Sequence, residues 1–198
     1  MLRRSTQINR RPAANIHHAT RFAEKIGRPL NRHSTISFSE LDVQPEHASA
    51  AFQKLISQRF SPWLRRHPKN IFSIPPTYVW TLEAASGCLA AHWAVHLPRG
   101  LMREYERKLR DWLTELSTSD MIGAAAKTTH IHNITGLKRY ILKGTDPHYA
   151  AICKITAIPQ GEVYGKRAGH SRNLGPVARR AAGYSARKNI VFAQYGGA

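Results

Sequence analysis

Cysteine is nearly absent from this chain, since Cys88 and Cys153 are the only two among 198 residues. Two cysteines are too few for a disulfide scaffold, and neither has a second cysteine at the spacing of a zinc site. The pattern is typical of a protein in a reducing compartment. We therefore expect a cytoplasmic location.

Several functional classes are excluded by motifs that the sequence lacks. No apolar run approaches the ~18 residues that a membrane-spanning helix needs, so no membrane partner is expected. The start, MLRRSTQINRRP, lacks the apolar stretch of a secretory signal, although an Arg-rich, acid-poor N-terminus is also compatible with an organellar transit peptide. Without a Walker-type loop or a Gly-x-Ser-x-Gly motif, nucleotide hydrolysis and serine chemistry have no support.

Acidic residues are scarce as well, and basic residues are abundant. The chain has 30 Lys and Arg against 12 Asp and Glu, which gives a net charge of +18. Eight of the basic residues fall in residues 1–33 and eleven in residues 137–198. A charge balance of this kind favours a polyanionic partner, and DNA or RNA is the expected one, with ribosomal RNA or membrane lipid as the alternatives.

Composition divides the chain into three parts. Residues 1–33 alternate Arg, Asn, His and Pro with little apolar periodicity, so we expect a flexible basic N-terminal arm. Residues 34–160 are expected to form a nucleic-acid-processing domain. Residues 161–198, punctuated by Gly and rich in Arg, are expected to form a flexible basic C-terminal tail.

Hydrophobic periodicity predicts the elements of the central part. Strands are expected at HSTISFSEL (33–41), TYVWTLEAA (77–85) and CLAAHWAVHLP (88–98), the last two joined by a hairpin turn at Ser86 and Gly87. Helices are expected at 45–67, with Pro62 breaking or bending its last turn, and at 99–117. A short strand at 128–133 leads into a helix that carries Tyr140, and 149–165 is expected to add another strand.

This order, β-α-β-β-α-β, predicts an α+β fold of the split β-α-β, ferredoxin-like type. In such a fold an antiparallel sheet is covered by helices on one face, and we expect the other face to be open for function. In the strand at 88–98, Leu89, Ala91 and Trp93 alternate with Ala90, His92 and Ala94. Because alternate side chains point to opposite faces, His92 is expected on the open face.

The segment GLKRYILKG (136–144) places Tyr140 three residues before Lys143. On a helix, this spacing puts the two side chains on the same face. A free phenol is a poor nucleophile at neutral pH because its pKa is about 10, so a nucleophilic tyrosine needs a nearby cation and a divalent ion on the phosphate. The plainer alternative is an amphipathic-helix aromatic beside an ordinary lysine.

From about Ser34 to Gly144 the sequence resembles the HUH-type endonucleases, which include rolling-circle replication initiators, relaxase-like proteins and related single-strand transposases. The resemblance rests on the order of elements, the polar strand STISFS, the histidine-bearing strand AAHWAVH and the segment YILKG. It implies single-stranded DNA nicking and joining, in plasmid- or phage-type rolling-circle replication or mobilisation. Tyr140 would be the nucleophile that forms a 5′-phosphotyrosyl link, Lys143 its helper, and Mg²⁺ or Mn²⁺ the cofactor.

The metal-binding part of the motif departs from the family. In the family two histidines stand two residues apart on one strand, about 7 Å between Cα atoms, whereas this chain has Ala90 where the partner of His92 is expected. Glu83, across the hairpin, is one candidate ligand to complete the site. The His130-Ile131-His132 triplet is the other candidate, and a coincidental triplet is the alternative to it.

Cations near Tyr140 and in the C-terminal part are the expected nucleic-acid contacts. They are Lys138, Arg139, Lys166, Arg167, Arg172, Arg179 and Arg180. Tyr184 is a candidate for stacking on bases or a bystander. The alternative to the enzyme is a non-catalytic module of the same fold that binds single-stranded DNA or RNA.

Overall fold

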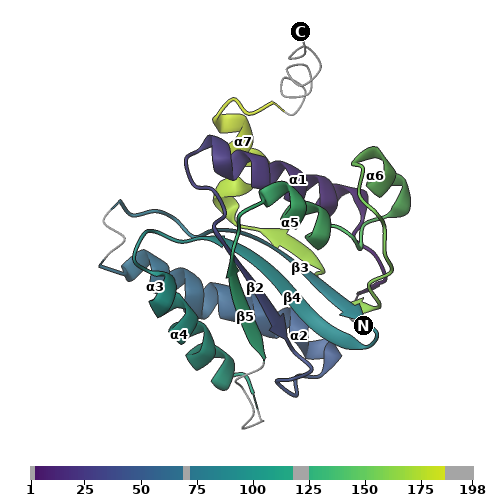
Figure 1. Cartoon of the computed structure of the whole chain (residues 1–198), viewed down its shortest axis with the longest axis horizontal. Coiled ribbons are helices and arrows are strands. Elements are labelled where there is room, and N and C mark those ends of the chain that lie inside the picture. The colour runs from purple at the N-terminus through teal and green to yellow at the C-terminus, as the bar shows by residue number, and fades with distance from the viewer. Residues whose placement is uncertain (1–2, 69–71, 118–124, 186–198) are drawn as a thin grey trace.

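A computed structural model of the chain describes residues 3–68, 72–117 and 125–185. At its centre lies a five-stranded antiparallel sheet with the strand order β5-β2-β4-β3-β7 (Figure 1). The strands are β2 (Arg32–Ser37), β3 (Thr77–Ala85), β4 (Cys88–His96), β5 (Ala126–His130) and β7 (Ala168–His170). The fold is α+β, and the predicted order β-α-β-β-α-β is present from β2 to β5.

The predicted hairpin joins β3 to β4, the two longest strands of the sheet. Ser86 and Gly87 both have positive φ, 52° and 79°, as the tightest two-residue hairpin turns require. The register pairs Thr81 with His92 and Glu83 with Ala90. This hairpin fixes which residues of β3 lie beside His92.

One face of the sheet is covered by α2 (Pro45–Lys54), the π-helical turn η1 (Leu55–Phe60), α3 (Ser61–Arg66) and α4 (Met102–Thr114). The aromatic core there centres on Phe60 and Trp93, whose ring centroids are 4.7 Å apart in an edge-to-face contact. Both rings are fully buried.

The helix expected at 45–67 runs from Pro45 to Arg66 with a widened turn in its middle. Pro62 has no N–H to donate and its ring would clash with the carbonyl four residues earlier in a regular α-helix. The π turn comes directly before it. Pro62 therefore sits in the first turn of α3, where its missing donor is tolerated.

The face that we expected to be open carries a second layer of helices, which corrects the expectation of helices on one face only. This layer consists of α1 (Arg10–Lys25), α5 (Ile134–Ile141), α6 (Pro147–Ile152) and α7 (Pro176–Ala181), with a short 3₁₀ turn, η2 (Arg172–Leu174). Figure 1 shows these helices on one side of the sheet and α2, α3 and α4 on the other. Buried Val79 and Ala94 of the sheet meet this layer.

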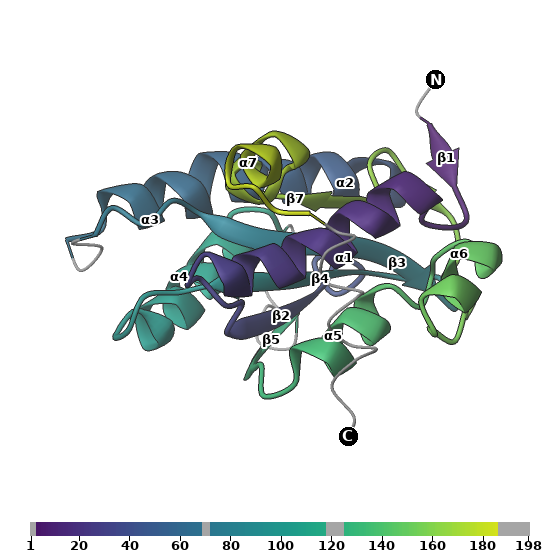
Figure 2. The same cartoon turned by 90° about the horizontal axis from the view of Figure 1, so that it is seen from above.

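Residues 1–33 are not a flexible arm where the structure describes them. Helix α1 crosses the strands (Figure 2) and buries Ala13, Ile16, Ala19, Phe22 and Ala23. Before it, β1 (Arg4–Ser5) pairs with β6 (Val163–Tyr164) in a separate two-stranded sheet. The N-terminal segment is thus part of the core.

The C-terminal part differs from its prediction in the same way. Residues 168–170 form the edge strand β7, and α7 packs within the second layer, so residues 161–185 belong to the fold. Residues 186–198 of the expected tail lie outside the described residues. The strand expected at 149–165 begins instead as α6. Asp146 caps that helix by accepting a hydrogen bond from the Tyr149 N–H at 3.1 Å, and Pro147 occupies its first turn.

None of the helices in the described ranges has both the length and the apolar character that a membrane crossing requires.

The packing of α1 gives a direct test. Phe22→Ala is expected to lower the free energy of unfolding by about 3–5 kcal/mol, because a buried ring is removed from the second core. Arg11→Ala, at an exposed position of the same helix, should change it by less than about 0.5 kcal/mol. Urea denaturation followed by tryptophan fluorescence measures both, and equal midpoints for the two variants would show that α1 is not packed as described.

Candidate functional site

Three strands place polar side chains together beneath α5. His33 and Thr35 of β2 and His92 of β4 lie on the same face, because Thr35 is opposite His92 in the register and His33 is two residues from Thr35. Thr35 Oγ1 is 3.4 Å from His92 Nδ1, and the rings of His33 and His92 stack with centroids 5.4 Å apart. The predicted direction of His92 is confirmed, although it is buried under α5 rather than open to solvent.

Glu83 joins this group from β3. Its Oε1 lies 2.9 Å from Nε2 of His92, and its Oε2 lies 3.1 Å from Nζ of Lys143. Burial raises the pKa of Glu83, but the contacts with His92 and Lys143 lower it by a larger amount. The pKa of Glu83 therefore lies below its usual value. Glu83 is therefore an anion held between two nitrogen groups.

Helix α5 brings Tyr140 and Lys143 to the same place. The helix begins at a cap in which Asn133 Oδ1 accepts a hydrogen bond from the Gly136 N–H at 2.9 Å, and Ile141 anchors it in the core. Lys143 lies just beyond its end, with Nζ 4.2 Å from the centroid of the Tyr140 ring. The ammonium thus contacts both the aromatic ring and the Glu83 carboxylate.

Tyr140 sits at the surface of this cluster. Its side chain is 44% exposed, while its ring meets His92 edge-on at 4.9 Å and His33 at 6.2 Å between centroids. We call His33, Glu83, His92, Tyr140 and Lys143 the Tyr140 cluster. Its tyrosine is anchored by buried groups and still accessible to a large ligand.

His33 is the member that sequence reasoning missed, because it fell within the expected N-terminal arm. Burial, with a smaller contribution from His92, lowers the pKa of His33 to about 4, so its ring is neutral at neutral pH. Its Nε2 is buried and has no hydrogen-bond partner among the described residues. The spacing His33-x-Thr35 could have revealed it, because two residues that are two positions apart on a strand point to the same face.

The four predicted metal ligands separate into two pairs. His130 is opposite Arg32 in the strand register, so its side chain points to the same face as Ser34 and Thr128, which hydrogen-bond to each other. His92 points to the opposite face. The exposed rings of His130 and His132 contact each other, with Nδ1 atoms 3.3 Å apart. The register therefore separates His130 from His92, and the His130-His132 pair stays a prediction as a separate candidate site.

His92 and Glu83 form the other pair. The Glu83 oxygen is close to His92 Nε2 but lies away from the direction in which a ring N–H would point, so Nε2 is buried without a hydrogen bond. A separation of 2.9 Å also suits two neighbouring ligands of one octahedral ion with bonds of about 2.1 Å. Within the described ranges, no group of three or more His, Cys, Asp and Glu side chains is placed to hold a metal. Any ion here has two protein ligands at most from the predicted set.

The predicted nucleic-acid contacts also divide into two groups. Arg139, Lys166, Arg172 and Arg180 are exposed, and Lys138 is partly buried. Arg167 and Arg179 are buried instead, and their guanidinium groups already have partners within the fold. The Arg167 guanidinium donates to the carbonyls of Ser5, Gly161 and Gln160 at 2.6–2.9 Å, and Arg179 donates to Asn15 at 2.7 Å.

Cations and histidines of α1 and α5 lie close enough to affect one another's pKa. Burial, Arg21 and Arg139 lower the pKa of Lys138, although Cys153 and Glu24 act in the opposite direction. Burial followed by Lys138 lowers the pKa of His17 to about 4. Tyr184 packs edge-on against Phe22 with centroids 5.3 Å apart, so its ring is part of this layer. An anion bound here would relieve repulsion that the fold leaves in place.

Comparison of this chain with protein-family models, with curated proteins and with solved structures finds no match.

The buried histidines predict a pH dependence of stability. The pKa of His17 is about 4 in the folded chain and about 6.5 in the unfolded chain, so its stabilising effect is complete above pH 6.5 and is lost as the pH falls toward 4. The free energy of unfolding should fall by about 1–3 kcal/mol over this window for each such histidine. His17→Asn should reduce the slope of urea-derived stability against pH, and an unchanged slope would contradict the assignment.

Proposed function

We propose that this chain nicks and rejoins single-stranded DNA through Tyr140, in a process of the plasmid or phage rolling-circle replication or mobilisation type. The observation that carries the proposal is the Tyr140 cluster, in which an exposed tyrosine is surrounded by a lysine, a carboxylate and two histidines from separate segments. The net charge of +18 supports a nucleic-acid substrate.

In the proposed reaction, the phenolic oxygen of Tyr140 attacks a phosphorus atom of the strand. A bond forms between that oxygen and phosphorus, and the bond from phosphorus to the 3′-oxygen breaks. The products are a 5′-phosphotyrosyl link and a free 3′-hydroxyl. Attack by such a hydroxyl on the link reverses the step and joins strands, with no change of oxidation state.

The phenolic proton needs an acceptor, and His33 is suited to the role. Its ring is neutral because its pKa is lowered to about 4, and its Nε2 has no partner among the described residues. The 3′-oxygen takes up a proton from solvent as it leaves, and in the reverse step the attacking hydroxyl gives its proton to solvent. His33 then returns the proton when the link is resolved.

Lys143 supports the negative charge that develops on the phenol and on the phosphate. Its position depends on Glu83, whose carboxylate is 3.1 Å from Nζ and in turn lies against His92. His92 also borders the Tyr140 ring at 4.9 Å. The ion pair therefore keeps a cation beside the nucleophile before any substrate arrives.

Mg²⁺ or Mn²⁺ is part of the proposal, with His92 Nε2 and Glu83 Oε1 as its protein ligands. Mg²⁺ commonly keeps several waters and is held by one or two carboxylates together with substrate phosphates, so two protein ligands are compatible with a site that the substrate completes. Such an ion supplies Lewis-acid polarisation of the attacked phosphate.

The second candidate function is a non-catalytic module that binds single-stranded DNA or RNA. The observation that favours it is that the described residues contain no group of three metal-ligating side chains. The two functions share the same basic surface, and they differ in whether a covalent link forms.

Covalent trapping tests the proposal. The protein incubated with 5′- and 3′-labelled single-stranded DNA and Mn²⁺ should form an adduct that survives boiling in SDS and retains the label 3′ to the cleavage site. Tyr140→Phe and added EDTA should abolish it, because each removes a required group. Tight binding with no adduct over a library of sequences would support the non-catalytic module instead.

The role of Lys143 can be separated from DNA binding. Lys143→Ala should slow the single-turnover rate of adduct formation by about 10²–10³-fold, as expected for loss of one preorganised charge at the reacting centre. Its affinity for DNA should change by much less. Lys54→Ala, at an exposed position of α2 in the other helical layer, is the matched control and should retain the wild-type rate; an equal loss in both variants would rule out a specific role.

A further inference from the structure

A cavity of about 450 Å³ lies where the N-terminal segment passes β7 and enters α1. Its walls come from segments far apart in the sequence. They are Arg3, Ser5, Gln7, Ile8, Asn9 and Pro12 on one side and Gly165, Lys166, Arg167 and Ala168 on the other. Three of these residues are cationic and none is acidic.

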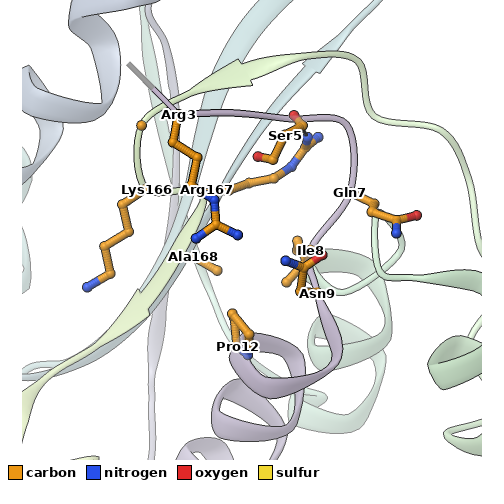
Figure 3. A pocket seen from close by; sticks show the side chains of 10 residues that line it. Arg3, Ser5, Gln7, Ile8, Asn9, Pro12, Lys166, Arg167 and Ala168 are labelled. Carbon is orange, nitrogen blue, oxygen red and sulfur yellow. Dashed lines mark hydrogen bonds between the residues drawn. The ribbon is translucent and has the colours of Figure 1, made fainter. Parts of the chain in front are cut away.

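The side chains differ in how they face the cavity (Figure 3). Arg3 extends toward Ala168, whereas Lys166 extends away from the other labelled side chains, with its Nζ 5.6 Å from the centroid of the Trp80 ring. Arg167 crosses behind them to reach the Ser5 carbonyl at 2.6 Å. The cavity is therefore lined by three cations whose side chains extend in different directions.

The wall of the cavity contains polar atoms that the fold does not satisfy. Arg167 is only 5% exposed, and its Nε has no hydrogen-bond partner among the described residues. The buried Oγ of Ser5 also has none within the same set. Unsatisfied buried donors beside a cavity are a cost that a bound acceptor would remove.

The start of α1 adds a further electrostatic contribution. This helix has 16 residues, Asn9 makes no side-chain capping bond, and the first turn contains no acidic residue. The first amides, at Arg10 and Arg11, have no acceptor within the helix. A helix start without its own acceptor or acid favours a bound anion.

Nearby carboxylates are already engaged. Asp146 accepts a hydrogen bond from Gln7 at 3.3 Å and caps α6, while Glu162 lies 3.6 Å from Arg4. Neither side chain lines the cavity. The charge inside the cavity is therefore not neutralised by the residues that form it.

One wall residue of the cavity is near the Tyr140 cluster along the sheet. The Leu82 N–H donates to the Arg167 carbonyl at 2.8 Å, so Arg167 is adjacent in the sheet to the residue before Glu83. A second hollow of about 250 Å³ shares Pro12, Lys166 and Ala168 with the first and extends past Arg11. A basic groove thus runs between α1 and β7.

We propose that this cavity binds a phosphate group of the single strand that Tyr140 attacks. Naming the anion as a strand phosphate rests on the proposed function, whereas the anion site itself rests only on the cavity. Arg3 and Lys166 are the side chains that contact the phosphate, the first amides of α1 donate to it, and Arg167 fixes the wall.

The first test uses inorganic phosphate alone. Titration into ¹⁵N-labelled protein should shift the amide resonances of Arg10, Arg11 and Gly165 in a saturable manner. Arg3→Ala combined with Lys166→Ala should abolish these shifts, and both positions are exposed, so folding should be retained. Arg103→Ala, an exposed arginine on α4 in the opposite layer, should leave them unchanged. Shifts that are absent, or that persist in the double variant, would overturn the anion site.

The second test uses single-stranded DNA and the Tyr140→Phe protein, in which no covalent step can occur. Adding the double substitution should lower the slope of log affinity against log salt by about 0.7, the amount expected for the loss of one phosphate contact. If the unsubstituted cavity binds inorganic phosphate but the double substitution leaves the salt slope unchanged, the cavity binds a phosphate from another source. That result would overturn the strand assignment. Because neither readout needs chemistry, failure of the trapping assay leaves both results interpretable.

Discussion

The carboxylate of Glu83 connects the two parts of the molecule on which any chemistry depends. It comes from the sheet, contacts the buried ring of His92, and holds Lys143 at the end of α5. A carboxylate in a partly buried position is stable only when it is paired, and removing one partner leaves an uncompensated charge. The ion pair therefore fixes α5 against the sheet, and with it the position of Tyr140.

That arrangement was predictable in part from the chain itself. Alternation along 77–98 gives the direction of His92, and the Ser86-Gly87 turn fixes the hairpin register. The register then brings Glu83 diagonally toward His92, two positions along β4 from its direct partner, Ala90. The helical spacing of Tyr140 and Lys143 completes the group. Local patterns suffice for the Glu83–His92 and Tyr140–Lys143 pairs, whereas the contacts that join these two pairs depend on how α5 packs on the sheet.

The remaining features of the site depend on long-range packing that no local pattern reports. Helix α1 carries its apolar stripe mostly on alanines, so Ile16 and Phe22 are its only large buried side chains and its histidines and arginines dominate the composition. His33 enters the cluster because α5, which carries Tyr140, packs over β2 and β4. Similarly, Arg167 is indistinguishable in sequence from a phosphate contact, although it is committed to three backbone carbonyls.

Burial of some cations changes how the positive charge of the chain is to be understood. Arg167 and Arg179 stabilise the fold and cannot leave their partners without exposing unsatisfied backbone or side-chain acceptors. Among the predicted contacts that remain accessible, Lys166 lines the cavity at the start of α1 and Arg139 lies on α5 beside Tyr140, while Arg172 and Arg180 are exposed elsewhere. Lys143 belongs to neither group, because it is held by Glu83 and lies over the tyrosine ring. The positive charge beside Tyr140 is thus supplied by the protein itself, and a divalent ion at His92 would add to it rather than create it.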